Sequence, residues 1–327
     1  MDYINYVKQS PFAGFAGYGG GATSLAFKGS DEPPDVFYGD RGVFGSGSQW
    51  APGWGNGQVI DYVNINSTGN ATNFGEPTTA GSQWAGTSNT SRGIMTRNNY
   101  IDYITIANTG NASDFGDLTN GIDTPTAFAG DANSDRGIIC QNNTTTNESI
   151  QTITISTTGN SSNFGTMSTS KASAGGASNG NRGLIAQTNS NWNNGNDIIY
   201  LTIATGGSTS NFGQLSVYQR WAIGACSSGY DVNRAVFAGG RNPSYNNTMD
   251  YVSFGSLGNA TDFGDMTQNK AYGRGTNNAT RGIFGCYALD GSATDRIDYI
   301  TVANTGNASD FGDLSQARAT ASALSGD

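Results

Sequence analysis

Short apolar runs recur along the chain, each bounded by turn-forming Gly, Asn, Ser and Thr. In the last such unit, RGIFG at residues 281–285 and IDYITVA at residues 297–303 are rich in β-branched and aromatic residues, which favours strands. NTGN at residues 304–307 has the chemistry of a tight turn, ASDFGDL at residues 308–314 can return as a third strand, and ATASALS at residues 319–325 supplies a fourth. The pattern predicts four antiparallel strands in each unit.

The unit repeats with a constant internal spacing. Residues 101–118 return almost unchanged at residues 297–314, with Val302 in place of Ile106. Weaker copies start at Ile60, Ile150, Ile198 and Met249, and in every copy a Phe follows 14 positions after the first residue. An Arg followed by Gly or Ala precedes each copy, and these arginines are 44 to 52 residues apart: Arg41, Arg92, Arg136, Arg182, Arg234 and Arg281.

This period is typical of β-propeller blades, which contain four strands in about 40 to 50 residues. We predict an all-β fold with six four-stranded blades, formed by residues 41–91, 92–135, 136–181, 182–233, 234–280 and 281–327. Residues 1–40 form a Gly- and aromatic-rich arm, although MDYI at residues 1–4 imitates a blade strand and leaves seven blades as an alternative.

The unit resembles a kelch repeat. The last unit has an apolar strand ending in Gly285, an acidic-Tyr pair at Asp298 and Tyr299, an aromatic at Phe311 and an Arg at Arg318, in the kelch order. The resemblance spans about 287 of 327 residues. The kelch strand order implies that residues 319–325 are the innermost strand of the first blade and pair beside residues 41–45, so that strands from both ends of the repeat array close the ring. Two departures are clear, because Phe replaces the kelch Trp, and the double glycine expected after the apolar strand appears clearly only at Gly239 and Gly240.

The repeat sequence IDYITIANTGNASDFGDL is similar to repeats in kelch-like virion structural proteins of tailed phages, especially phages of marine bacteria. The resemblance implies a virion location, with assembly in the host cytoplasm, as part of a tail fibre or a capsid appendage. A cytoplasmic location outside a virus is the alternative.

Composition and charge exclude several functions. The net charge of −9 and the absence of a Lys/Arg cluster oppose nucleic-acid binding. No signal peptide and no apolar run of 18 residues is visible, so neither export nor membrane insertion is expected. Cys140, Cys226 and Cys286 are odd in number and widely spaced, which indicates core residues and no disulfide framework.

The sequence offers little catalytic chemistry. It has no His, which removes the commonest acid-base group and the commonest metal ligand, and with them the copper chemistry of kelch-type oxidases. Three Asp pairs recur in the repeats, and their recurrence favours a turn role over a glycosidase pair or a calcium site: Asp114 with Asp117, Asp262 with Asp265, and Asp310 with Asp313. We expect no cofactor and no metal. The recurring Arg is expected to bond strand-end carbonyls or acidic residues, with a shared anion in the channel as the alternative.

The links between the second and third strands vary most, whereas the TGN turns barely change, and variation on one face often marks the binding face. The variable links carry the aromatic candidates for binding, Trp50, Trp54, Trp192 and Tyr245. The alternative is that each ring folds back over its own blade. In the arm, Phe12, Phe15 and Tyr18 are candidates for assembly contacts. The constant turns are expected to be scaffold, and replacing Gly110 or Gly306 by a β-branched residue should destabilise the fold if the turn needs positive φ.

We therefore expect a non-enzymatic virion structural protein that uses its propeller for assembly or for binding a host-surface protein or glycan. Its expected partners are other virion proteins, with further copies of the chain as an open possibility. A kelch-like protein-binding adaptor outside a virus is the alternative function, and a carboxylate-only glycosidase is a distant third.

Overall fold

The computed structural model describes residues 39–49, 55–122, 126–129, 135–140, 149–168, 174–186, 196–217, 222–227 and 233–326. All of them belong to the compact unit Pro34–Asp327. They form strands and connecting segments without an α-helix, so this part of the chain contains no helix that is long and apolar enough to cross a membrane.

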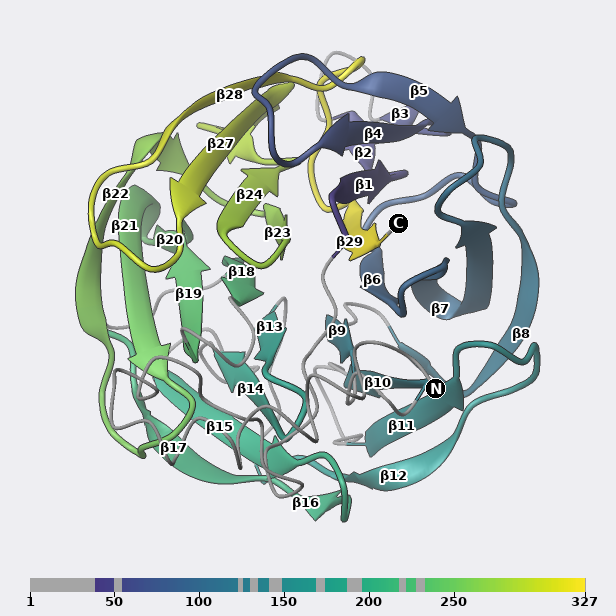
Figure 1. Ribbon diagram of the computed structural model, residues 1–327, viewed down its shortest axis with the longest axis horizontal. Coiled ribbons are helices and arrows are strands. Elements are labelled where there is room, and N and C mark those ends of the chain that lie inside the picture. The colour runs from purple at the N-terminus through teal and green to yellow at the C-terminus, as the bar shows by residue number, and fades with distance from the viewer. Residues whose placement is uncertain are drawn as a thin grey trace, which may run out of the picture. The chain divides into compact units, whose positions relative to one another are not determined.

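Within this unit, six antiparallel sheets surround a central axis as the blades of a β-propeller (Figure 1). From the axis outward, blade 1 contains β29 (Ser322–Gly326), β1 (Arg41–Gly45), β4 (Ile60–Asn64) and β5 (Thr72–Gly75). Blade 2 contains β6 (Ala85–Ser88), β7 (Arg92–Thr105) and β8 (Ser113–Ile122), and blade 3 contains β9 (Thr126–Ala129), β10 (Arg136–Cys140), β11 (Ser149–Thr154) and β12 (Ser162–Thr166). The predicted six-bladed fold is confirmed for the described residues.

The second half of the ring is built in the same way. Blade 4 contains β13 (Gly175–Ser178), β14 (Arg182–Ala186), β15 (Asp197–Thr202) and β17 (Ser210–Gln214). Blade 5 contains β18 (Gly224–Ser227), β19 (Arg234–Ala238), β21 (Ser244–Ser253) and β22 (Thr261–Lys270), and blade 6 contains β23 (Arg274–Asn277), β24 (Arg281–Gly285), β27 (Arg296–Thr301) and β28 (Ser309–Asp313). In blade 2, β7 supplies both middle strands, because its first part pairs with β6 and its second part with β8.

The two ends of the repeat array close the ring, as predicted. β29 pairs antiparallel with β1, with Arg41 opposite Gly326 and Gly45 opposite Ser322. The closing strand starts three residues later than the predicted residue 319, because Thr320 has a left-handed backbone with φ of 57° and breaks the extended run. Its N–H instead donates to the Tyr272 carbonyl at 3.0 Å. Closure removes two sheet edges that would otherwise be unpaired.

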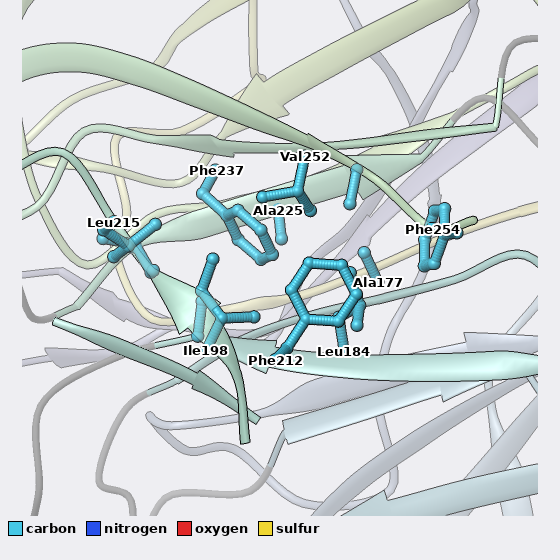
Figure 2. Close-up of a cluster of buried hydrophobic side chains, with 12 residues drawn as sticks. Ala177, Leu184, Ile198, Phe212, Leu215, Ala225, Phe237, Val252 and Phe254 are labelled. Carbon is cyan, nitrogen blue, oxygen red and sulfur yellow. The ribbon is translucent and has the colours of Figure 1, made fainter. Parts of the chain in front are cut away.

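The hydrophobic core lies between neighbouring blades. The cluster in Figure 2 combines Leu184 and Phe212 of blade 4 with Phe237 of blade 5, and Phe237 is fully buried. Burying one such side chain stabilises the fold by about 1.5–3 kcal/mol. In five blades the Tyr of the third strand also meets the Phe of the fourth edge-to-face, with ring centroids 5.9 to 6.1 Å apart.

The TGN turn of each blade docks on the outer strand of the preceding blade. At the first interface the Gly110 N–H donates to the Phe74 carbonyl at 2.8 Å, and Asn111 Oδ1 accepts from the Glu76 N–H at 3.1 Å. Equivalent bonds to an Asn side chain join four further pairs of blades, through Asn70, Asn160, Asn259 and Asn307. Between blades 3 and 4, Ser208 stands in the Asn position, and β16 (Gly207–Ser208) pairs parallel with β12.

This docking explains the Gly that follows the repeated Phe. A Cβ on Gly75 would lie 2.2 Å from the Gly110 carbonyl oxygen, and a Cβ on Gly264 would lie 2.4 Å from that of Gly306. The condition of positive φ in the turn holds at Gly306, with φ of 155°. It does not hold at Gly110, which lacks a left-handed backbone and has open space around a Cβ. Steric crowding is therefore greatest at the Gly after the repeated Phe, where the turn of the next blade docks.

The three cysteines are buried free thiols, Cys140, Cys226 and Cys286. Burial raises the pKa of the Cys286 thiol to about 11 and shifts the pKa of the other two in the same direction. These thiols therefore remain protonated at neutral pH and pack as small core residues.

Candidate functional site

The propeller has two unlike faces. We call the face that carries the TGN turns and the links between first and second strands the constant face. The variable face carries the links between second and third strands, together with the links from one blade to the next. In blade 1 these two kinds of link touch, because the Gly47 N–H donates to the Gly81 carbonyl at 3.0 Å.

On the constant face, the recurring arginines join the blades. Arg92 stacks over Tyr103 of its own blade, 4.5 Å from the ring centroid, and donates through Nη1 to the Ile155 carbonyl of the next blade at 3.0 Å. The same arrangement of a stacked ring and a carbonyl acceptor recurs in the other blades at Arg41, Arg136, Arg182, Arg234 and Arg281. These arginines bond strand-end carbonyls, as the sequence predicts.

The Asp of the repeated Asp-Tyr pair is buried and also joins two blades. Asp102 accepts hydrogen bonds from the Thr78 N–H at 2.9 Å and the Thr78 hydroxyl at 2.6 Å, across the interface with blade 1. Asp61 and Asp298 bond Ser315 and Thr267 in the same way.

Of these three carboxylates, Asp61 and Asp298 each form an ion pair, and Asp102 does not. Asp61 pairs with Arg318 and Asp298 with Lys270, both at 2.9 Å and without solvent exposure of the carboxylate. Asp102 forms no ion pair with any described residue. Burial raises the pKa of Asp102, assisted by the neighbouring charge of Asp114 and opposed by the hydrogen bonds from Thr78.

The repeated Asp pairs lie on or beside the outer strands. Asp114 and Asp117 are exposed, and the Asp117 N–H donates to Asn160 Oδ1 of the next blade at 2.9 Å. Among the described residues, no group of three or more His, Cys, Asp and Glu side chains is placed to hold a metal ion.

The variable face carries short hairpins that extend the blades. In blade 5 the link between the second and third strands, expected over residues 239–248, is largely strand, with β20 (Arg241–Asn242) folding back on the start of β21. Similar hairpins occur in blade 1, with β2 (Ser48–Gln49) and β3 (Gly55–Asn56), and in blade 6, with β25 (Ala288–Leu289) and β26 (Ser292–Ala293). The strands extend because each hairpin pairs its own backbone groups.

A cleft of about 360 Å³ lies between the hairpins of blades 5 and 6, lined by Arg241, Pro243, Ser244, Tyr245, Asp290 and Gly291. Tyr245 is half-buried, and its ring centroid lies 5.5 Å from the Arg241 guanidinium carbon and 6.3 Å from the Tyr272 ring centroid. Arg241 Nε donates to the Pro243 carbonyl at 2.8 Å, which holds the guanidinium at the cleft. An aromatic ring, a fixed cation and an exposed carboxylate thus share one open cleft, a combination suited to binding.

Of the aromatic candidates, Tyr245 is described and borders this cleft. Trp50, Trp54 and Trp192 lie outside the described residues, as do the arm residues Phe12, Phe15 and Tyr18. Sequence reasoning missed the cleft residues Arg241 and Asp290. The sequence signal that could have indicated the hairpin of blade 5 is the pair Gly239 and Gly240, which begins this hairpin with positive φ values of 67° and 115°.

The innermost strands enclose a narrow channel with small side chains at its middle level, Gly86, Ala127, Gly176, Ala225, Gly275 and Ala323. It contains two cavities of about 80 and 40 Å³. Hydroxyl groups, including those of Ser178 and Ser325, line the larger one, and Arg274 lines the smaller one.

No protein-family model matches the chain, and no curated protein matches it. The fold and the geometry of the two faces are therefore the basis for a functional proposal.

Proposed function

We propose that the protein is a non-enzymatic binding and assembly module whose variable face makes the contacts. A β-propeller fits a protein-binding or structural role. The observation that carries the proposal is the unequal use of the two faces. On the constant face, the repeated Arg and Asn groups are already bonded to neighbouring blades, whereas the variable face presents the Tyr245 cleft.

As the finer part of this proposal, the module belongs to a virion, where the propeller would contact other virion proteins or a host-surface glycan or protein. What supports this step is the resemblance of the repeat to kelch-like proteins of tailed phages. The absence of His from the sequence supports a non-enzymatic role.

The virion assignment is tested by immunogold electron microscopy, using antibodies against the purified propeller on phage particles from the source culture. Labelling at one place on the particle supports the proposal. Labelling of host cytoplasm alone supports the adaptor, and release of reducing sugar from a glycan panel by the purified protein supports the glycosidase.

The contribution of the cleft is tested with Tyr245→Ala and Arg241→Ala against a matched control, Leu257→Ala. Leu257 is 56 % exposed and lies on the turn between β21 and β22, on the constant face. We expect the cleft variants to lose at least about tenfold in affinity for the glycan or virion protein that the wild type binds, equal to roughly 1.4 kcal/mol. Their melting temperatures should stay near that of the wild type. Equal losses in all three variants would place recognition elsewhere.

A further inference from the structure

At one position of the innermost strands, blade 6 has a charged residue where the other five blades have small uncharged ones. Each innermost strand places one residue opposite the fifth residue of the neighbouring strand. Five blades have a small uncharged residue there, Ala85, Thr126, Gly175, Gly224 and Ser322. Blade 6 has Arg274, whose guanidinium reaches across the channel toward blade 2.

The bonds of Arg274 leave much of its donor capacity unused. Nε donates to the Trp84 carbonyl at 3.1 Å and Nη1 to the Gly273 carbonyl at 3.0 Å. A guanidinium has five N–H donors, and neither acceptor is charged. Arg274 forms no ion pair with any residue that the structure describes. By contrast, the buried cations Arg318 and Lys270 each hold an Asp at 2.9 Å.

Arg274 nevertheless remains charged at neutral pH. Burial lowers the pKa of its guanidinium to about 10, which is still well above 7. A partly buried charge without a counter-charge is costly, and a bound anion would offset that cost.

The channel has room for such an anion. The 40 Å³ cavity beside Arg274 is bounded by Gly86, Ala127 and Ala323, among other small residues. A water molecule needs roughly 10–15 Å³ of such volume, so a small anion fits there and a polypeptide segment does not. The neighbouring 80 Å³ cavity adds hydroxyl donors farther along the channel.

We propose that the central channel binds one small inorganic anion, of the size of a halide, on the Arg274 guanidinium. The anion would complete the donor set of Arg274 and link blade 6 to blade 2 through a charge-assisted contact. The site is separate from the Tyr245 cleft, so it does not depend on the function proposed above.

The direct test is anomalous diffraction from wild-type crystals grown in bromide. We expect a bromide peak in the channel within hydrogen-bond distance of Arg274. Ordered water alone in that cavity, or a peptide carboxylate bound to Arg274, would overturn the proposal.

The solution test compares melting temperatures in sodium chloride and in sodium gluconate at equal ionic strength, because gluconate is too large for the cavity. We expect chloride to raise the melting temperature of the wild type by several degrees relative to gluconate, and to lose this effect in Arg274→Gln. Arg97→Gln is the matched control, since Arg97 Nε also donates to a link carbonyl, Ser82 at 2.8 Å, but lines neither cavity. General salt effects act on the control as well, so a chloride effect on the melting temperature that is lost only in Arg274→Gln is specific to the site. An equal chloride effect in all three proteins would refute the site, and the bromide experiment remains decisive if Arg274→Gln does not fold.

Discussion

Asp61, Asp102 and Asp298 are three of the four buried carboxylates at the same position of the repeat, the fourth being Asp250. Replacing each of the three by Asn should give different results. Asp61→Asn leaves Arg318 buried without its partner, and an Arg does not release its proton. Removing one member of a buried ion pair costs about 3–5 kcal/mol. For a protein of this size, that corresponds to a fall of roughly 4–7 °C in melting temperature.

Asp298→Asn should cost less, because Lys270 can become neutral. Burial is the largest effect on Lys270 and lowers its pKa, while Asp298 opposes that shift. Without Asp298 the folded state would hold neutral Lys270, whereas the unfolded state binds the proton. The unfolded state then binds more protons, so the stability of Asp298→Asn relative to the wild type should rise with pH. Asp61→Asn should show no such trend.

Asp102→Asn should be nearly neutral, with a change of about 1 kcal/mol or less, because no described cation is left unpaired. The folded pKa of Asp102 is raised, so Asp102 contributes most to stability at pH values below the unfolded pKa of 3.8. That contribution is lost as the pH rises through the higher folded pKa. The stability of Asp102→Asn relative to the wild type should therefore rise from acidic to neutral pH.

The assay is thermal unfolding of the four proteins across pH 3 to 9, in a buffer of constant ionic strength. The expected order of stability loss at pH 7 is Asp61→Asn, then Asp298→Asn, then Asp102→Asn. Equal losses at all three positions would show that the hydrogen bonds to Ser and Thr dominate, and that the cations contribute little.

Two further predictions concern the ring itself. Gly75→Ala should lower the free energy of unfolding by about 2 kcal/mol or more, because its Cβ would lie 2.2 Å from the Gly110 carbonyl oxygen. Gly110→Ala, on the other side of the same contact, should lower it by about 1 kcal/mol or less, because a Cβ there meets open space. Denaturant titration of both variants checks this, and equal losses would contradict the docking. Deleting residues 322–327 removes β29 and unpairs β1, so we expect aggregation or cooperative loss of folding in light scattering and melting curves, and an unchanged melting temperature would exclude the closure.

The sequence predicts those parts of the fold that each repeat carries within itself. The repeat unit follows from the constant distance of 14 residues between its first apolar residue and the Phe, and the blade number follows from the six repeated arginines. The closing strand follows from the kelch order of the strands. The carbonyl role of the repeated Arg also follows, because one geometry must serve every blade.

The contacts between blades were harder to predict. Gly75 meets Gly110 and Arg274 meets Trp84 only after the ring has formed, and nothing in their local sequence indicates either neighbour. The cleft at Tyr245 depends likewise on two hairpins in different blades. An Arg in a strand of small residues was visible in the sequence, but its meaning depends on the channel.

The docking of the constant face explains why the repeat varies where it does. From Ile101 to Phe115 the chain contains the Tyr under Arg92 and the Asn that bonds the preceding blade, so an insertion there would displace at least one of these contacts. The distance from the repeated Arg to the next apolar strand is free of that constraint, and it ranges from 9 residues after Arg92 to 19 after Arg41. Hairpins on the variable face can therefore change in length and composition at little cost to the ring. A ligand-binding surface that differs between related propellers is expected on that face, where the Tyr245 cleft lies.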